Sequence, residues 1–337
     1  MDLDLDAQQE ALVGSFAELL ARHAPPARVR AAEPLGFDPQ LWTALLGVGV
    51  VEMAVPEAGG GWGASLLDLA LVAEQLGLAV APAPVIECQV AARLLARVDP
   101  AAARDRSAGS PSRLLTLAVR PASAGLATLV PAGAVADDAL VLDGDRLLLV
   151  ALGDGRRPVA NLGAAPLADV TVDPAAPVLA RGPAAVAAFE SAVDEWLVLT
   201  AAALVGMAAA AHRLTCAYAR ERRTWGLPIG AYQAVAHPLA DDATAVDGAR
   251  LLAADAAWEL GRGSARGAEL AAMAFAFAAA TARRVTYDAV HFHGGYGFMV
   301  EHDAQLYYRR ARTWARVWGS TDDAYVRVAR ARYGRTS

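Results

Sequence analysis

Apolar residues recur at helical spacing toward both ends of the chain, and the pattern changes in between. In the first third, the spacing predicts three helices separated by loops rich in glycine and proline, at Gln8–His23, Pro39–Val50 and Leu66–Leu76. In the last third it predicts four longer helices, at Ala184–Arg223, Tyr232–Arg262, Ser264–His291 and Ala304–Trp318. Long helices joined by short loops that contain glycine are typical of an antiparallel bundle.

The middle of the chain has the pattern of a small β domain. Short Leu-rich or β-branched runs alternate with Gly, Pro and Asp over residues 113–119, 139–152 and 168–172. The Asp-Gly-Asp at 143–145 lies between two apolar runs, which is a hairpin signal. The expected fold is therefore mainly α with a small β domain. It comprises an N-terminal helical domain (1–105), a middle β-barrel-like domain (106–180) and a C-terminal four-helix bundle (183–337).

The composition narrows the class of protein. Of the 337 residues, 55% are hydrophobic and only 20% are charged, which is few for a monomer that covers its own surface. A large apolar interface would account for both values, so we expect an oligomer. All 30 basic residues are arginine, they are scattered, and the net charge is −6. Nucleic acid is therefore not an expected partner.

The remaining features argue against several kinds of site. Cys88 and Cys216 are far apart and lack the spacing of metal ligands, so neither a disulfide framework nor a zinc site is expected, and a reducing cytoplasm fits. His291 and His293 would lie on different sides of a helix, so a metal pair is not expected. The acidic start of the chain does not resemble a secretory signal. The Ala-rich run near residue 205 predicts a buried helix and no contact with a membrane.

Four motifs in order make the chain resemble the flavin-dependent acyl-CoA dehydrogenase family. They are LWTALLGVGVVEMAVPEAGGGWGASLLDLALVAEQLG, the Arg-x-x-aromatic-Gly…Gln pattern in ARERRTWGLPIGAYQ, the glycine turn in AVHFHGGYGF, and the YYRRAR stretch. The resemblance covers nearly the whole chain and implies helices, then a β domain, then a helix bundle. It also implies α,β-desaturation of an acyl-CoA thioester by FAD, with electron-transfer flavoprotein as the electron acceptor.

Two of these motifs carry the candidate cofactor-binding residues. The Arg222 guanidinium can make a two-pronged contact with a phosphate, Trp225 offers a flat apolar face, and Gln233 offers an amide. Gly294 and Gly295 remove side chains, so a ligand or another chain can approach the backbone. The resemblance implies that these elements reach across a subunit interface to the pyrophosphate and adenosine of a neighbour's FAD. A solvated helix end, a core tryptophan and a helix C-cap are the alternative interpretations.

The catalytic positions depart from the family. Its members remove an α-proton with a glutamate that lies either after the Arg stretch or, in a minority, on the long bundle helix. Trp318 and Trp196 occupy these two positions, so no catalytic residue is assigned. Glu195 is adjacent, but one residue turns a helical side chain by about 100°. Asp322 is expected in the first turn of the terminal helix. The sequence leaves open whether either carboxylate replaces the base.

The β domain departs as well. Val119 and Arg120 replace the Thr and Glu of the family's Thr-Glu-Pro-x-x-Gly-Ser segment, and residues 100–190 contain no tryptophan to cover a flavin ring. The motif that supports a neighbour's FAD is thus retained, whereas the chain's own flavin site is not. We therefore expect a base-less subunit of a heteromeric enzyme, a heterotetramer with a homologous subunit that supplies the glutamate. In this respect the chain resembles the paired-subunit acyl-CoA dehydrogenases of actinobacterial steroid degradation.

Three other functions stay open at this point. One is a homomeric, flavin-dependent hydroxylase of the same fold, which needs no glutamate base. Another is a binding subunit that holds no nucleotide. The third is a homo-oligomeric dehydrogenase in which Glu195 is displaced into the site. The residues also leave open whether this chain binds FAD alone and which acyl group is oxidised.

Overall fold

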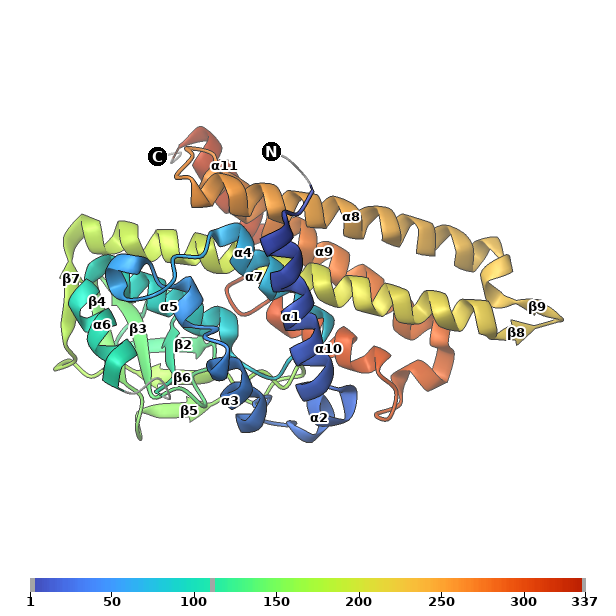
Figure 1. Cartoon of the computed structure of the whole chain (residues 1–337), viewed down its shortest axis with the longest axis horizontal. Helices are drawn as coiled ribbons and strands as arrows, with labels where there is room; N and C mark the ends of the chain where they lie inside the picture. The colour runs from blue at the N-terminus through green and yellow to red at the C-terminus, as the bar shows by residue number, and fades with distance from the viewer. Residues whose placement is uncertain (1–3, 110–112, 335–337) are drawn as a thin grey trace. The chain divides into compact units, whose positions relative to one another are not determined.

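The computed structural model describes residues 4–109 and 113–334 (Figure 1). The chain divides into two compact units. One consists of the residues up to Arg30, Ala70–Ala81 and the chain from Val198 onward, and the other consists of Ala31–Leu69 and Pro82–Leu197. Two helices, α4 (Leu66–Leu78) and α7 (Gly182–Glu221), have residues in both units.

The second of these units combines short helices with two small sheets. Its helices are α3 (Pro39–Gly47), η1 (Glu52–Ala54), η2 (Glu57–Gly59), α5 (Val85–Val98) and α6 (Pro100–Gly109). A four-stranded sheet has the order β1-β3-β4-β7, from Leu115–Leu117, Asp138–Asp143, Arg146–Ala151 and Val178–Arg181. A three-stranded sheet has the order β2-β6-β5, from Leu126–Val130, Ala168–Thr171 and Arg156–Pro158.

The hairpin predicted at residues 143–145 is confirmed. Strands β3 and β4 pair antiparallel from Asp138 opposite Ala151 to Asp143 opposite Arg146. Gly144 in the turn has φ +62°, a conformation that glycine adopts without the steric cost that a side chain would bring. The strand pair is apolar and almost entirely buried, which explains why the sequence shows near-continuous apolar runs here instead of a clean alternation.

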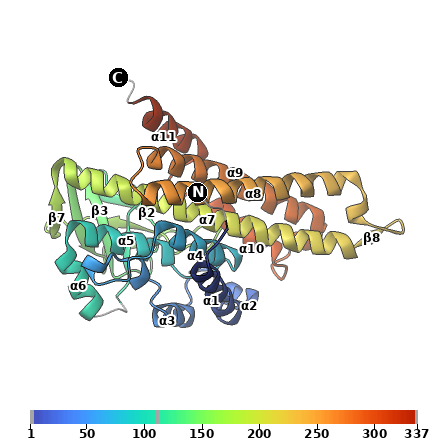
Figure 2. The ribbon, with the colours of Figure 1, turned by 45° about the horizontal axis from the view of Figure 1, so that its top comes forward.

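The other unit is a bundle of long helices. It contains α1 (Ala7–His23), α2 (Pro26–Ala31), α8 (Gln233–Gly261), α9 (Gly267–His293), α10 (Ala304–Trp314) and α11 (Thr321–Tyr333), together with the end of α4 and most of α7. Helices α7, α8 and α9 run side by side in both Figure 1 and Figure 2. Helix α9 also packs against α10 and α11.

The predicted fold class is confirmed. The four helices expected in the last third correspond to α7, α8, α9 and α10, and α11 follows them. All seven strands of the two sheets lie between Leu115 and Arg181. The exact boundaries of the three predicted domains stay a prediction.

Helix α7 is the longest helix of the described chain, with 40 residues. Within the described ranges it is the one helix long and apolar enough to cross a membrane, and 78% of its apolar window is buried inside the structure. It therefore has the burial of the core helix of a globular protein, as the Ala-rich run near residue 205 predicted.

Helices α4 and α7 approach each other closely enough for their backbones to touch. A Cβ on Gly206 of α7 would lie 2.1 Å from the carbonyl oxygen of Glu74, and a Cβ on Gly77 of α4 would lie 1.9 Å from that of Ala203. Real Cβ atoms do not approach backbone atoms so closely. Both glycines are therefore required by the distance between the two helices.

Candidate functional site

The candidate cofactor-binding residues of the second motif lie where α7 ends. A short hairpin follows, made of β8 (Arg223–Thr224) and β9 (Leu227–Pro228). It turns at Trp225 and Gly226, which have φ of +48° and +83°. The Tyr232 hydroxyl donates to the Thr224 carbonyl at 2.9 Å and ties the hairpin to the start of α8.

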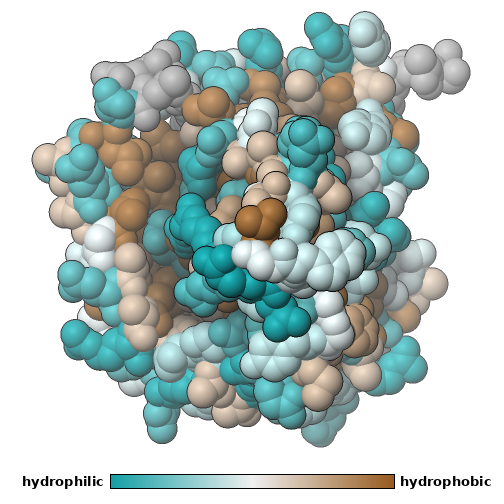
Figure 3. Space-filling view, turned by 90° about the vertical axis from the view of Figure 1, so that its right-hand side faces the viewer, coloured by the Kyte–Doolittle hydropathy of each residue, from teal (hydrophilic) through white to brown (hydrophobic). Residues whose placement is uncertain are grey.

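The hairpin presents its side chains to solvent. Trp225 is 96% exposed, which is extreme for a tryptophan and excludes the interpretation of Trp225 as a core residue. Arg222 and Gln233 are also exposed, and within the part of the chain that the structure describes, neither side chain has a hydrogen-bond partner. Figure 3 faces the side of the molecule on which this hairpin is drawn in Figure 1, and brown and pale residues lie there among teal ones.

The glycine turn of the third motif follows α9 directly, as η4 (Gly294–Phe298). A Cβ on Gly294 or Gly295 would meet no atom within 4 Å, so the backbone there is open to another molecule. Gly297 differs, because a Cβ there would lie 2.8 Å from the Val290 carbonyl oxygen. The turn exposes several large apolar side chains, at Tyr296, Phe298, Met299 and Val300.

A column of rings holds this turn against the end of α7. The buried His293 ring stacks on Tyr218 of α7 with centroids 4.3 Å apart, and it donates from Nδ1 to the Ala289 carbonyl at 2.6 Å. His302 lies 4.5 Å from His293, and Tyr296 lies 4.6 Å from His302. Burial lowers the pKa of both histidines. The structure thus brings the hairpin and the glycine turn to the same end of the bundle.

The two histidines of the third motif have different surroundings. His291 is exposed and stacks on Tyr287 at 6.1 Å, whereas His293 is buried. The two rings lie on different sides of α9, as the helical spacing predicted.

Both tryptophans that the sequence predicts at the family's base positions pack inside the protein. Trp196 is 2% exposed in α7 and lies near Glu87 of α5. Burial raises the pKa of Glu87, and the neighbouring backbone and Trp196 indole oppose that rise. In the other unit, the Trp318 ring meets Phe275 edge-on at 5.9 Å, and the Arg327 guanidinium lies 6.0 Å from it.

The carboxylates near these positions have structural partners. Glu195 is buried and accepts from Arg93 Nε at 3.0 Å and from Arg97 Nη2 at 2.6 Å. Arg93 also donates to the Ala54 carbonyl at 3.0 Å, so this cluster joins α7, α5 and η1. Asp323 closes a capping box with Ser320 at the start of α11, and Asp322 lies exposed in its first turn. The sequence identified these acids but not the arginines that pair with Glu195.

The β domain carries Arg120 at the position where the sequence predicts a replacement of the family's glutamate. Its Nε and Nη2 atoms are buried and have no hydrogen-bond partner within the ranges that the structure describes. Val119 beside it is buried as well. A valine and an arginine cannot supply the hydroxyl and carboxylate of the family's segment, so these residues do not fit the role of a flavin-ring site.

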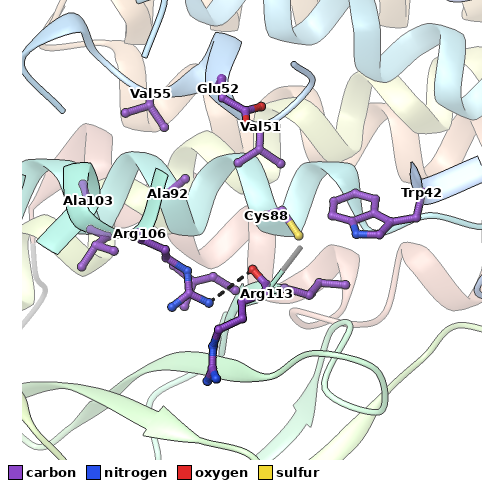
Figure 4. Close-up of a pocket in the computed structure, with 12 residues that line it drawn as sticks. Trp42, Val51, Glu52, Val55, Cys88, Ala92, Ala103, Arg106 and Arg113 are labelled. Carbon is purple, nitrogen blue, oxygen red and sulfur yellow. Dashed lines mark hydrogen bonds between the residues drawn. The ribbon is translucent and has the colours of Figure 1, made fainter. Parts of the chain in front are cut away.

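A separate cavity lies in the unit that contains the sheets. Residues of α3, η1, α5, α6 and β1 line it, and Figure 4 shows Trp42, Glu52 and Cys88 around the same space. Arg106 Nη2 donates to the Arg113 carbonyl at 3.3 Å beside it. The cavity measures about 60 Å³, which is room for a few water molecules but not for an acyl thioester. Burial raises the pKa of the Cys88 thiol, which makes it a poor nucleophile.

Two carboxylates meet between α8 and α9, a pair that the sequence did not indicate. Asp242 is buried and accepts from Arg284 Nε at 3.0 Å. Burial raises the pKa of Asp242 to about 6, the Arg284 hydrogen bond opposes the rise, and the Asp288 charge adds to it. Burial also raises the pKa of Asp288. Because the pKa values of both carboxyl groups are raised in the folded protein, the free energy of unfolding depends on pH.

The Asp242→Asn variant should become more stable relative to wild type as the pH rises. The folded protein binds the Asp242 proton more tightly than the unfolded chain, so the contribution of Asp242 to stability is lost as the pH rises through about 6. Between pH 4.5 and 7.5 we expect the variant to gain about 1–2 kcal/mol in free energy of unfolding over wild type, measured by urea denaturation. The exposed neighbour Asp241→Asn is the control. Parallel pH profiles of wild type and Asp242→Asn would contradict the assignment.

Comparison with known proteins agrees with this fold. Residues 6–105 match the model of the acyl-CoA dehydrogenase N-terminal domain, and residues 189–331 match that of the C-terminal domain. The acyl-CoA dehydrogenase IpdE2 of Mycolicibacterium smegmatis is 31% identical over 318 residues, which cover 94% of this chain and 96% of IpdE2. This chain belongs to the acyl-CoA dehydrogenase family.

Solved structures similar to this acyl-CoA dehydrogenase include two that are named for two components. The ChsE4-ChsE5 complex from Mycobacterium tuberculosis matches with a TM-score of 0.89, 27% identity and 100% coverage of both chains. The Tcur3481-Tcur3483 steroid ACAD variant matches with a TM-score of 0.87 and 28% identity, over 96% of this chain and 97% of the other. Structures of the same fold include a glutaryl-CoA dehydrogenase from Mycobacterium smegmatis in complex with FADH2 and PigA with FAD and proline, at 15% and 18% identity.

Proposed function

We propose that this chain is the base-less subunit of a heteromeric acyl-CoA dehydrogenase. The observation that carries the proposal is the contrast between two sets of family positions. At the end of the bundle, the residues that would support a neighbouring chain's FAD are exposed and have no side-chain partner among the described residues, most clearly Arg222 and Trp225. At both positions where the resemblance places the family's base stands a packed tryptophan, Trp196 in one unit and Trp318 in the other.

The residues at the bundle end suit the pyrophosphate and adenosine of a FAD whose flavin ring lies in the partner. Arg222 would bind the pyrophosphate through a two-pronged, charge-assisted contact, and the face of Trp225 would cover an apolar ring. The open backbone at Gly294 and Gly295 would allow the partner chain or its cofactor to come close, and the Gln233 amide would reach the nucleotide. When bound, FAD supplies the acceptor of the β-hydride. The partner subunit would supply the glutamate that removes the α-proton.

The partner would be a homologous acyl-CoA dehydrogenase subunit, in a heterotetramer built through the bundle. The outer side of α8 and α9 exposes large apolar side chains that such a contact would bury, at Leu251, Trp258 and Phe277. Both similar structures are named for a pair of components, and one of them is named a steroid ACAD. By this analogy the substrate would be a steroid-derived acyl-CoA, handled in the cytoplasm with electron-transfer flavoprotein as the electron acceptor.

A count of FAD per chain tests the proposal. This chain would be co-expressed with a homologous acyl-CoA dehydrogenase chain that carries the glutamate, and the purified complex would be assayed for flavin and for thioester oxidation. We expect about one FAD per two chains. Arg222→Ala should weaken FAD binding by about 10- to 100-fold, because it removes a charge-assisted contact to phosphate. Arg262→Ala is the control, since Arg262 is exposed and its one ion-pair partner among the described residues is Glu259, three residues away.

Other outcomes would point to other functions. One FAD per chain in this protein purified alone, together with thioester oxidation, would overturn the heteromeric proposal. Loss of that activity in Glu195→Gln would then identify a displaced base. Consumption of O₂ with reduced flavin would indicate a hydroxylase.

A further inference from the structure

A second, larger cavity lies in the bundle unit. None of the residues proposed to support FAD lines it. It is bordered by α1, the turn between α1 and α2, the C-terminal end of α4, α7 and α10. Its volume is about 470 Å³, within the range of roughly 300–1,000 Å³ that is usual for small-molecule sites. Four polar side chains line it, Gln75, Arg213, Asp303 and Tyr307, and the rest of the lining is apolar.

Two of the four polar side chains are occupied by partners within the protein. Asp303 forms an ion pair with Arg30, which also donates to the Glu301 carbonyl at 2.6 Å. The Tyr307 hydroxyl donates to the Leu78 carbonyl at 3.2 Å. Burial and Asp303 raise the pKa of Tyr307, so this phenol stays neutral near pH 7. The cavity therefore keeps neither a free negative charge nor a free phenolic proton.

The other two polar side chains remain available to a ligand. Within the described ranges no carboxylate lies at ion-pair distance from Arg213, and the Gln75 amide has no hydrogen-bond partner. The positive charge of Arg213 lowers the pKa of Tyr307, which indicates that its guanidinium lies near that side of the cavity. With Asp303 neutralised by Arg30, the cavity has one unbalanced positive charge.

The walls around this charge are apolar and well defined. Leu20 of α1 and Leu306 of α10 are 2% and 1% exposed. At the end of α4, Val80 has φ +42°, a rare and strained conformation for a β-branched residue, and the Ala81 amide donates to the Leu76 carbonyl at 3.0 Å. The surrounding structure thus fixes the shape of this wall.

We propose that this cavity binds an amphipathic monocarboxylate, with its carboxylate on Arg213 and Gln75 and its hydrocarbon body against α1 and Leu306. A peptide would bury backbone groups against a lining that offers them few partners. A cation would be repelled by Arg213, and a neutral apolar molecule would offer no counter-charge to its guanidinium. The inference does not rest on the proposed function, because none of the FAD-supporting residues lines the cavity.

Titration with decanoate and with decanol, followed by isothermal calorimetry below the critical micelle concentration, tests the proposal. The wild-type chain should bind about one decanoate per chain. Arg213→Gln should weaken decanoate binding about tenfold, the loss expected for one charge-assisted contact at a partly open site. The same variant should leave decanol binding within about twofold, because decanol has no charge to lose.

Two further variants distinguish the cavity from general attraction. Ala21→Trp puts a large ring at the cavity wall from an exposed position of α1, so it should abolish binding of both probes while the protein stays folded. Arg220→Gln, an exposed arginine two turns along the same helix, should leave both affinities unchanged. The proposal would be overturned by absent saturable binding to wild type, by equal losses in Arg213→Gln and Arg220→Gln, or by binding that survives in Ala21→Trp.

Discussion

Replacing Gly206 with alanine is expected to lower the free energy of unfolding by about 3 kcal/mol or more, since the added Cβ forces two packed helices apart. That Cβ would lie 2.1 Å from the Glu74 carbonyl oxygen and 2.8 Å from the Leu78 amide nitrogen. Both atoms belong to the backbone of α4, which cannot yield as the tip of a side chain can. The shift in the midpoint of urea denaturation measures the effect.

A glycine in an open helix position provides the matched control. Gly14 lies in α1, and a Cβ there would meet no atom within 4 Å. Gly14→Ala should therefore raise the free energy of unfolding by about 0.5–1 kcal/mol, through helix propensity alone. The two substitutions should change the free energy of unfolding in opposite directions, which distinguishes the effect of a backbone contact from that of helix propensity. A Gly206→Ala protein as stable as Gly14→Ala would contradict the α4–α7 contact.

Removal of the Glu195 side chain is expected to destabilise the fold by about 3–5 kcal/mol, because it leaves two arginines in a largely buried cluster without their counter-charge. Glu195 is 6% exposed at the side chain, and Arg93 is 16% exposed. Glu195→Ala would be measured by urea denaturation in parallel with catalytic assays. If the loss of activity follows the loss of folded protein, Glu195 acts through structure and not as a base.

The control is an ion pair of the same type on the surface. Glu259 lies 3.7 Å from Arg262, whose side chain is 62% exposed, so Glu259→Ala should change stability by less than about 1 kcal/mol. Replacing Arg93, Arg97 and Glu195 together with methionine should recover much of the stability, since apolar groups of similar size do not require desolvation of charge. A stable Glu195→Ala protein that has lost activity would instead favour the displaced base.

The sequence predicted the elements better than the contacts among them. Helical spacing located α1, α3 and α4, and the Asp-Gly-Asp turn located the β3–β4 hairpin. Order and spacing of the motifs indicated the acyl-CoA dehydrogenase family, which both family models confirm. These signals are local, because the period of apolar residues and the chemistry of turns depend on residues only a few positions apart.

The candidate site was predicted in its residue types but not in its environment. The sequence identified Arg222, Trp225 and the glycine turn, yet a tryptophan in such a motif fits a core position as well as an exposed one. The structure decides this, with Trp225 96% exposed and His293 stacked on Tyr218. Their role in holding a partner's FAD stays a prediction.

The sequence by itself thus determined the order of helices and strands and the family, whereas the assignment of Trp196 and Trp318 to the base positions stays a prediction. Only the tertiary structure decided which groups meet across long separations, such as Arg93 with Glu195, Asp242 with Arg284, and Gly206 with the Glu74 carbonyl. The physical reason is that helix periodicity specifies which face is apolar, but not the neighbour, the distance or the charge that the face will meet. Those depend on how all the elements pack together.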